Sequence, residues 1–427
     1  GPGPARREAR LTVRTTRLPN GIRVVTEDVP SAHSVATGFW VGVGARDEGP
    51  GLAGASHFLE HLLFKGTEAR TAASIAEAVD AVGGEMNAYT THEYTAYYTR
   101  LPAGQLVLGL DLLSDVLWAP AFRPAEVEAE RQVILEELLA EEDCPDERVH
   151  TLLAEAMFPD HPLGAEVLGT EASIRGMGRE QIRGFHANWY RPANLVVAAA
   201  GRLDHDEVVQ GVERRFAGGD GGEAPSRQPP TGPARRLAVL TRPTEQAYVA
   251  VGVPAPDRHD DDRFALVVAN QVLGGGMSSR LFRTIREDRG LAYSVGSSVS
   301  AYTDAGVLVA SAGTTPARVP EVLGLVHAEL DRILDGGVTE HELAVAKGCV
   351  EGSTLLGLED PGSRMGRIGD AMLTHGEVRE VDDVLARFRS VERADVDRVL
   401  ERVLGGGPRT VAVVGPVRAG RLEELVA

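Results

Sequence analysis

The chain has 427 residues, of which 43% are hydrophobic and 5% aromatic, enough for two or three globular units. Its 62 acidic and 44 basic side chains leave a formal charge of −18, which argues against nucleic acid as a partner, because phosphate binding requires a basic face. No apolar run reaches the roughly 18 residues of a membrane span, and the two cysteines cannot form a thiolate metal site. We therefore expect a cytoplasmic protein that does not bind membranes and whose metal, if any, is held by histidine and carboxylate.

The first predicted element is a strand over residues 11–17, where apolar and polar residues alternate. The arginines in and before this segment are also found in transit peptides, but the alternation favours the strand. Apolar residues recurring at three and four positions predict amphipathic helices. These helices cover residues 72–82, 104–118, 124–142, 316–334 and 339–356.

Three pairs of similar blocks are separated by roughly 210 residues, which indicates an internal duplication. The pairs are 34–43 with 245–253, 84–98 with 291–309, and 194–208 with 409–422. Between the copies, a Gly- and Pro-rich segment at 218–233 has no apolar periodicity and is interpreted as a linker. The predicted fold is α+β, with two duplicated halves at 1–217 and 234–427. Each half is a mainly antiparallel sheet flanked by helices.

A short predicted helix contains the pattern His57-x-x-Glu60-His61, with Ser56 as its cap and Gly66 as its stop. One helical turn separates the two histidines, so both imidazoles project from one face and can hold one Zn²⁺. Glu60 lies beside them and can reach a water bound to the metal. The alternative is two core histidines next to a solvated glutamate.

A zinc hydrolase needs a third protein ligand and an open position for water. The helix predicted at 124–142 offers Glu130 and Glu137, which are seven residues apart on one partly apolar face. Periodicity alone is equally compatible with a salt-bridged row on the protein surface.

The chain resembles the pitrilysin or insulinase family of zinc metallopeptidases, which includes insulin-degrading enzyme and mitochondrial processing peptidase. The reversed order His-x-x-Glu-His is typical of inverzincins. Family-like blocks are found at 57–67, 83–98, 161–170 and 189–201. The resemblance implies one Zn²⁺ per chain and a third ligand about 76 residues beyond the second histidine, which selects Glu137. It makes Glu130 an assisting carboxylate and Glu60 the general base on the zinc-bound water.

In the second half, residues 274–293 are similar to the family's Gly-rich loop and to its Arg and Tyr pair. We assign that pair to Arg286 and Tyr293, as groups that bind substrate and assist catalysis, with Arg289 as the competing arginine. In the second copy, residues 269–276 take the place of the helix that carries His57 and His61, and they contain no histidine. The C-terminal half is therefore expected to bind substrate and no metal.

Substrate is expected to add as a strand beside Asn87, Ala88 and Tyr89, because an open strand edge near the metal can pair with an extended peptide. These expectations describe a homodimeric zinc endopeptidase that cuts unfolded peptides or leader sequences inside a closed chamber. Two alternatives remain at this stage. One is a weakly active or inactive subunit that serves as a peptide-binding scaffold, and the other is one half of an obligate heterodimer.

Overall fold

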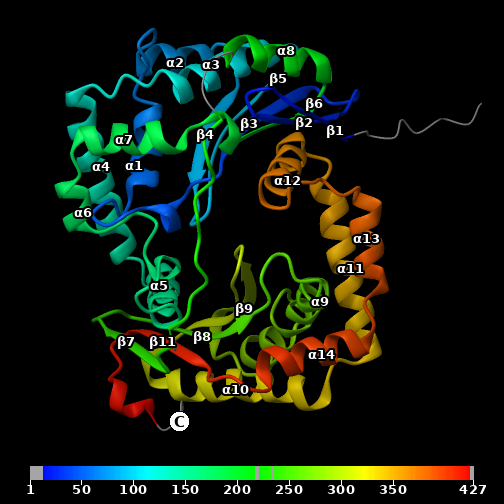
Figure 1. The fold of residues 1–427 in the computed structure, drawn as a ribbon. Coiled ribbons are helices and arrows are strands. Elements are labelled where there is room, and N and C mark those ends of the chain that lie inside the picture. The colour runs from blue at the N-terminus through cyan, green and yellow to red at the C-terminus, as the bar shows by residue number, and fades with distance from the viewer. Residues whose placement is uncertain (1–12, 217–220, 233, 424–427) are drawn as a thin grey trace, which may run out of the picture.

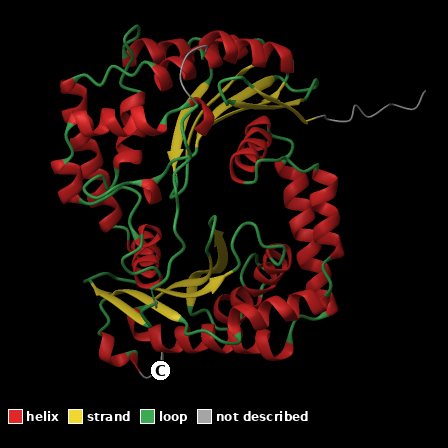
Figure 2. Ribbon diagram, in the orientation of Figure 1, coloured by secondary structure: helices red, strands yellow, loops and turns green. Residues whose placement is uncertain are grey.

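The computed structural model describes residues 13–216, 221–232 and 234–423. Two sheets lie at opposite ends of the molecule, and helices cover them (Figure 1, Figure 2). This architecture confirms the α+β prediction of two similar halves. Residues 11–12 of the predicted first strand, and 218–220 and 233 of the predicted linker, lie outside the described residues.

The first sheet has the strand order β1-β2-β6-β3-β5-β4 and is antiparallel except between β2 and β6. Its strands are β1 (Val13–Arg17), β2 (Arg23–Asp28), β3 (Ser34–Val41), β4 (Glu85–Thr90), β5 (Thr95–Pro102) and β6 (Leu195–Gly201). The central strands are apolar at almost every position because both faces of the sheet are buried. Phe39 of β3 packs into the core under the flanking helices, whereas its neighbour Trp40 packs into a second core on the opposite face.

The second sheet repeats this topology in the order β7-β11-β8-β10-β9, with β7 and β11 parallel. Its strands are β7 (Leu237–Thr241), β8 (Ala247–Ala255), β9 (Ala292–Ala301), β10 (Gly306–Thr314) and β11 (Thr410–Gly415). In the sheet order β7-β11-β8-β10-β9, the strands correspond one to one with β2-β6-β3-β5-β4 of the first sheet. The duplication inferred from the sequence is therefore visible in the topology.

The other regular elements of the described chain are mainly α-helices. The first half contains α1 (Ala55–Leu63), α2 (Ala72–Asp80), α3 (Leu106–Trp118), α4 (Pro124–Glu142), α5 (Pro145–Met157), α6 (Glu171–Gly176), α7 (Arg179–Trp189) and α8 (His205–Arg215). The second half contains α9 (Arg263–Leu273), α10 (Val319–Gly336), α11 (Glu340–Gly357), α12 (Pro361–Thr374), α13 (Val381–Ser390) and α14 (Arg393–Leu404). Among these described helices, none has both the length and the apolar character that a bilayer crossing needs.

Two helices are exchanged between the halves. Helix α12 packs on β2, β3 and β6 of the first sheet, and α5 packs on β7, β8 and β11 of the second (Figure 1). The two helices occupy equivalent places in the duplicated sequence. Helix α5 directly follows α4, and α12 directly follows α11. Each sheet is thus covered on one face by helices of its own half and on the other by a helix of the other half. The hydrophobic cores of the halves are consequently shared.

The contact between α12 and the first sheet depends on a glycine. A Cβ atom at Gly369 would lie 2.6 Å from the Trp40 ring, which is 1% exposed. At Gly366, one turn earlier on the same helix, a Cβ atom would meet nothing within 4 Å. The indole therefore requires a helix surface without a side chain at position 369.

We expect Gly369→Ala to lower the free energy of unfolding by about 1–3 kcal/mol, because the added methyl group overpacks the interface with Trp40. Gly366→Ala is the matched control, and it should raise that free energy by about 0.5–1 kcal/mol through the helix preference of alanine. Denaturant unfolding of both variants measures the difference. Equal stabilisation by both would contradict the tight packing of α12.

Candidate metal centre

The N-terminus of helix α1 is held by the carboxylate of Glu48, which lies in the loop before the helix. It begins at Ala55, after Gly54 in the left-handed conformation at φ 85°, and the backbone N–H groups of Gly54 and Ser56 donate to Glu48 at 2.7 Å each. The predicted cap at Ser56 is therefore wrong, because Ser56 lies inside the first turn and Glu48 supplies the acceptor. The helix ends at Leu63, before the predicted stop at Gly66.

The apolar side of α1 anchors the helix in the core of the first half. The four side chains on that side are each at most 2% exposed, and they are Phe58, Leu59, Leu62 and Leu63. The remaining face carries His57, Glu60 and His61, which are partly buried. The local sequence pattern thus turns both imidazoles and one carboxylate toward the same side.

Helix α4 packs against α1 and brings Glu137 to the two histidines. Its Oε2 atom lies 3.6 Å from the Nε2 atom of His57 and 3.4 Å from the Nε2 atom of His61. In the described part of the chain, these three side chains form the one group of histidine, cysteine and acidic residues that converges closely enough to hold a metal ion. The structure therefore brings together the three residues predicted as ligands.

The donor atoms of this site fit a zinc ion. Ligands at about 2.0 to 2.1 Å in a tetrahedral site lie roughly 3.3 Å from one another. Glu137 Oε2 lies 3.6 and 3.4 Å from the two Nε2 atoms, and the three donor atoms lie within 4.8 Å of one another. Burial, with a smaller contribution from His61, lowers the pKa of His57 to about 4, so this imidazole is neutral at pH 7. Neutral imidazole and ionised carboxylate are the forms that bind metals. A cation between the three atoms would offset the repulsion of their lone pairs.

Glu130 is buried behind the site instead of lying in a surface row. Its side chain is 5% exposed and accepts from His61 Nδ1 at 3.0 Å and from Lys65 Nζ at 2.7 Å. A proton on Nδ1 of His61 leaves the Nε2 lone pair free to face Glu137, which is the orientation that a metal ligand requires. Lys65 thus gives the buried carboxylate a cationic partner.

Glu60 is held by a contact with strand β4. Its Oε2 atom accepts a hydrogen bond of 2.5 Å from the Thr90 hydroxyl. Burial raises the pKa of the Glu60 carboxyl above its ordinary value, and the hydrogen bond from Thr90 acts in the opposite direction. The carboxyl is thereby held in one orientation with an increased affinity for a proton.

Strand β4, which contains Asn87, Ala88 and Tyr89, is the edge of the first sheet and contacts α1. Within the described residues it pairs only with β5, so its other edge carries no ladder. Tyr89 is 39% exposed. The three predicted substrate-binding residues therefore lie on a strand that can accept another strand.

The predicted Arg and Tyr pair lies in the second half. Arg286 belongs to the π-helical turn η4 (Phe282–Glu287) and stacks on Tyr293, with 4.9 Å between its guanidinium carbon and the ring centroid. Tyr293 is 80% exposed at the start of β9. Arg289 instead donates to the Thr284 carbonyl oxygen at 3.1 Å. The structure thus joins Arg286 to Tyr293, but it does not bring this pair into contact with the metal-binding group.

Three contributors to the site were not predicted from the sequence. Lys65 lies four residues after His61, and that spacing was a usable signal for a neighbour on the same face. Glu48 lies six residues before Gly54 and Thr90 lies 30 residues after Glu60, and no local pattern marks either contact.

Two sequence profiles match the chain. "Insulinase (Peptidase family M16)" matches residues 23–171, and "Peptidase M16 inactive domain" matches residues 176–348. The first matched segment includes the complete His57, His61 and Glu137 group.

Curated relatives match over almost the whole chain. A protein of Streptomyces coelicolor named as an uncharacterized zinc protease is 46% identical over 97% of this chain and 93% of its own length. Relatives with the same designation are 42% identical in Mycobacterium tuberculosis, over 97% and 95%, and 36% identical in Bacillus subtilis, over 90% and 92%.

Solved structures share the fold. A protease from Helicobacter pylori has a TM-score of 0.89 at 23% identity, covering 95% of this chain and 100% of that one. An M16-like peptidase from Alicyclobacillus acidocaldarius has a TM-score of 0.84 at 24% identity, covering 95% and 99%. Taken with the profiles and the curated relatives, the duplicated fold and the His-His-Glu group lead to one assignment: the chain belongs to the insulinase family, peptidase family M16.

Proposed function

We propose that the protein is a zinc-dependent endopeptidase that hydrolyses extended or unfolded peptides and leader sequences. The observation that carries this proposal is the convergence of His57, His61 and Glu137 beside a separately held Glu60. Relatives named as zinc proteases support the choice of metal. The three ligands leave a fourth position for substrate or water, as catalytic zinc sites do.

Bound zinc would polarise the peptide carbonyl and lower the pKa of water in the site. Glu60 then accepts the proton of the attacking water and passes it to the leaving amine. Its raised pKa suits this exchange, because a general base works best when its pKa is near the working pH. Thr90 fixes which carboxylate oxygen is engaged on the protein side and which remains free.

The substrate is proposed to pair with the open edge of β4. Main-chain hydrogen bonds along Asn87, Ala88 and Tyr89 would give affinity with little sequence preference, and they require an extended peptide. Folded proteins cannot present such a strand, so selection for unfolded chains follows from this mode of binding. A chamber lined by the negative charge of the chain would favour basic or leader-like peptides.

Tyr293 and Arg286 are proposed to donate to the carbonyl oxygen as negative charge develops on it. Both are on the second half, so catalysis requires the halves to close around the peptide. We further propose a homodimer in which two chains enclose the chamber, because one chain carries the ligand set, the base and the Arg and Tyr pair.

Glu60→Gln should reduce peptide hydrolysis by at least roughly 100-fold and leave the zinc content unchanged, because only the proton acceptor is removed. Turnover of an unfolded peptide and metal analysis measure the two effects. Glu68→Gln, the same change at an exposed position, is the control. Near-normal turnover by Glu60→Gln would remove the proposed role of Glu60, and a chain inactive in every form would indicate a scaffold.

Glu137→Gln should lower zinc affinity by roughly 10- to 100-fold or more, since a neutral amide is a poorer ligand than a carboxylate. Glu136→Gln, at the adjacent exposed position of α4, should retain zinc. Competition with a chromogenic chelator measures both affinities. Equal affinities would move the third ligand to another residue.

Tyr293→Phe should lower kcat by roughly 10- to 100-fold with a small change in KM, because the lost hydroxyl acts mainly on the transition state. Tyr248→Phe removes a hydroxyl that contacts the side chain of Gln246 and serves as the control. Steady-state kinetics on one peptide separate the two parameters. A change confined to KM would assign Tyr293 to substrate affinity alone.

A further inference from the structure

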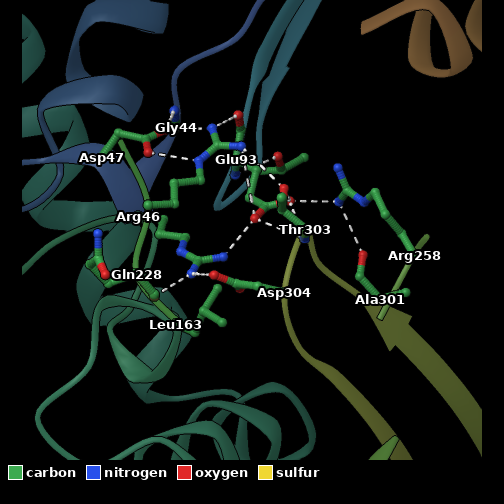
Figure 3. Close-up of polar contacts among 12 residues, drawn as sticks. Gly44, Arg46, Asp47, Glu93, Leu163, Gln228, Arg258, Ala301, Thr303 and Asp304 are labelled. Carbon is green, nitrogen blue, oxygen red and sulfur yellow. Dashed lines mark hydrogen bonds and ion pairs between the residues drawn. The ribbon is translucent and has the colours of Figure 1, made fainter. Parts of the chain in front are cut away.

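A buried carboxylate joins the two halves and the linker. Glu93, 2% exposed, lies 2.7 Å from Arg46 of its own half and 2.7 Å from Arg258 of the second half (Figure 3). Its oxygens also accept from the backbone N–H of Thr303 at 3.1 Å, and Arg227 of the linker lies 3.8 Å away. The charge of Glu93 is therefore already satisfied by protein groups.

A cavity of about 440 Å³ lies beside this cluster, with walls from both halves and the linker. Four arginines line it, namely Arg17, Arg23, Arg227 and Arg258, and Glu93 is the one carboxylate among its described lining residues. Arg227 is paired with Asp47 at 2.8 Å and Arg258 with Glu93 at 2.7 Å, so among the described residues the excess positive charge of the cavity comes from Arg17 and Arg23. Such a cavity concentrates anions.

Within the part of the chain that the structure describes, two of the four arginines have no acidic partner. Arg17 of β1 lies directly opposite Arg23 of β2 in the sheet register, and in the described ranges neither forms an ion pair. Arg23 donates to the Met372 carbonyl oxygen at 3.0 Å, which leaves most of its N–H groups free. Burial, and then the charge of Arg17, lowers the pKa of Arg23. Like charges facing each other across two strands destabilise a sheet, and a bound anion would remove that cost.

We propose that this cavity is a binding site for a small phosphate-type oxyanion with two or more negative charges, such as pyrophosphate or the phosphates of a nucleotide. Guanidinium groups donate paired N–H bonds that match phosphate oxygens, and Arg17 and Arg23 present two such groups side by side. Because both halves and the linker form the walls, the anion stabilises their docking. The site is separate from the His57, His61 and Glu137 group.

The test is calorimetric titration of the zinc-loaded full-length protein with pyrophosphate at constant ionic strength, together with thermal unfolding over the same concentrations. We expect saturable binding and a midpoint temperature that rises with ligand concentration, as preferential binding to the folded state requires. Arg17→Gln/Arg23→Gln should weaken binding by roughly tenfold or more. Arg175→Gln/Arg183→Gln, which removes two exposed arginines outside the cavity, should bind as the wild type does.

Pyrophosphate also binds zinc, so the comparison between the variants decides the outcome. Arg17→Gln alone, at an exposed position, guards against misfolding of the double variant and should still weaken binding. ATP in a parallel titration distinguishes the sources: equal affinity assigns the site to the phosphates, and tighter binding assigns it to a nucleotide. Absence of saturable binding, or affinities unaffected by the Arg17 and Arg23 changes, overturns the proposal.

Discussion

The exchange of α5 and α12 between the two sheets joins the hydrophobic cores of the two halves. Each sheet has two apolar faces, and one of them is covered by a helix of the other half. The metal site is connected to this exchange because α4, the helix of Glu137, is followed after two residues by α5. Packing of α5 on the second sheet thus ties the C-terminal end of α4 to the other half.

Three glutamates at the candidate metal centre differ in their surroundings and therefore in what each can do. Glu130 is buried and paired with Lys65, so it orients His61. Glu137 is 42% exposed and faces both Nε2 atoms, so it is available as a ligand. Glu60 is hydrogen-bonded to Thr90 and has a raised pKa. The three side chains are chemically identical, so their different burial and their different contacts set these roles.

The junction between the halves also uses charge to set geometry. Arg46 and Arg258 contact Glu93 from the two halves (Figure 3). Arg227 of the linker lies 3.8 Å from the same carboxylate, so the halves and the linker meet at one buried point. The β4–β5 turn connects that point to the site, because it carries Thr90 at one end and Glu93 near the other. One short turn thus lies between the buried junction and the residue that holds Glu60.

The sequence by itself determined the features that depend on local spacing and on repetition. One helical turn placed His57, Glu60 and His61 on one face, the paired blocks predicted two similar sheets, and the family resemblance selected Glu137. Only the tertiary structure decided that Glu48 caps α1, that Thr90 holds Glu60 and that α5 and α12 change places. The Thr90 contact and the exchange of the two helices join residues far apart in the chain, and the Glu48 contact spans a loop of irregular structure. Local periodicity reports which face of an element is apolar but not which surface or side chain meets it.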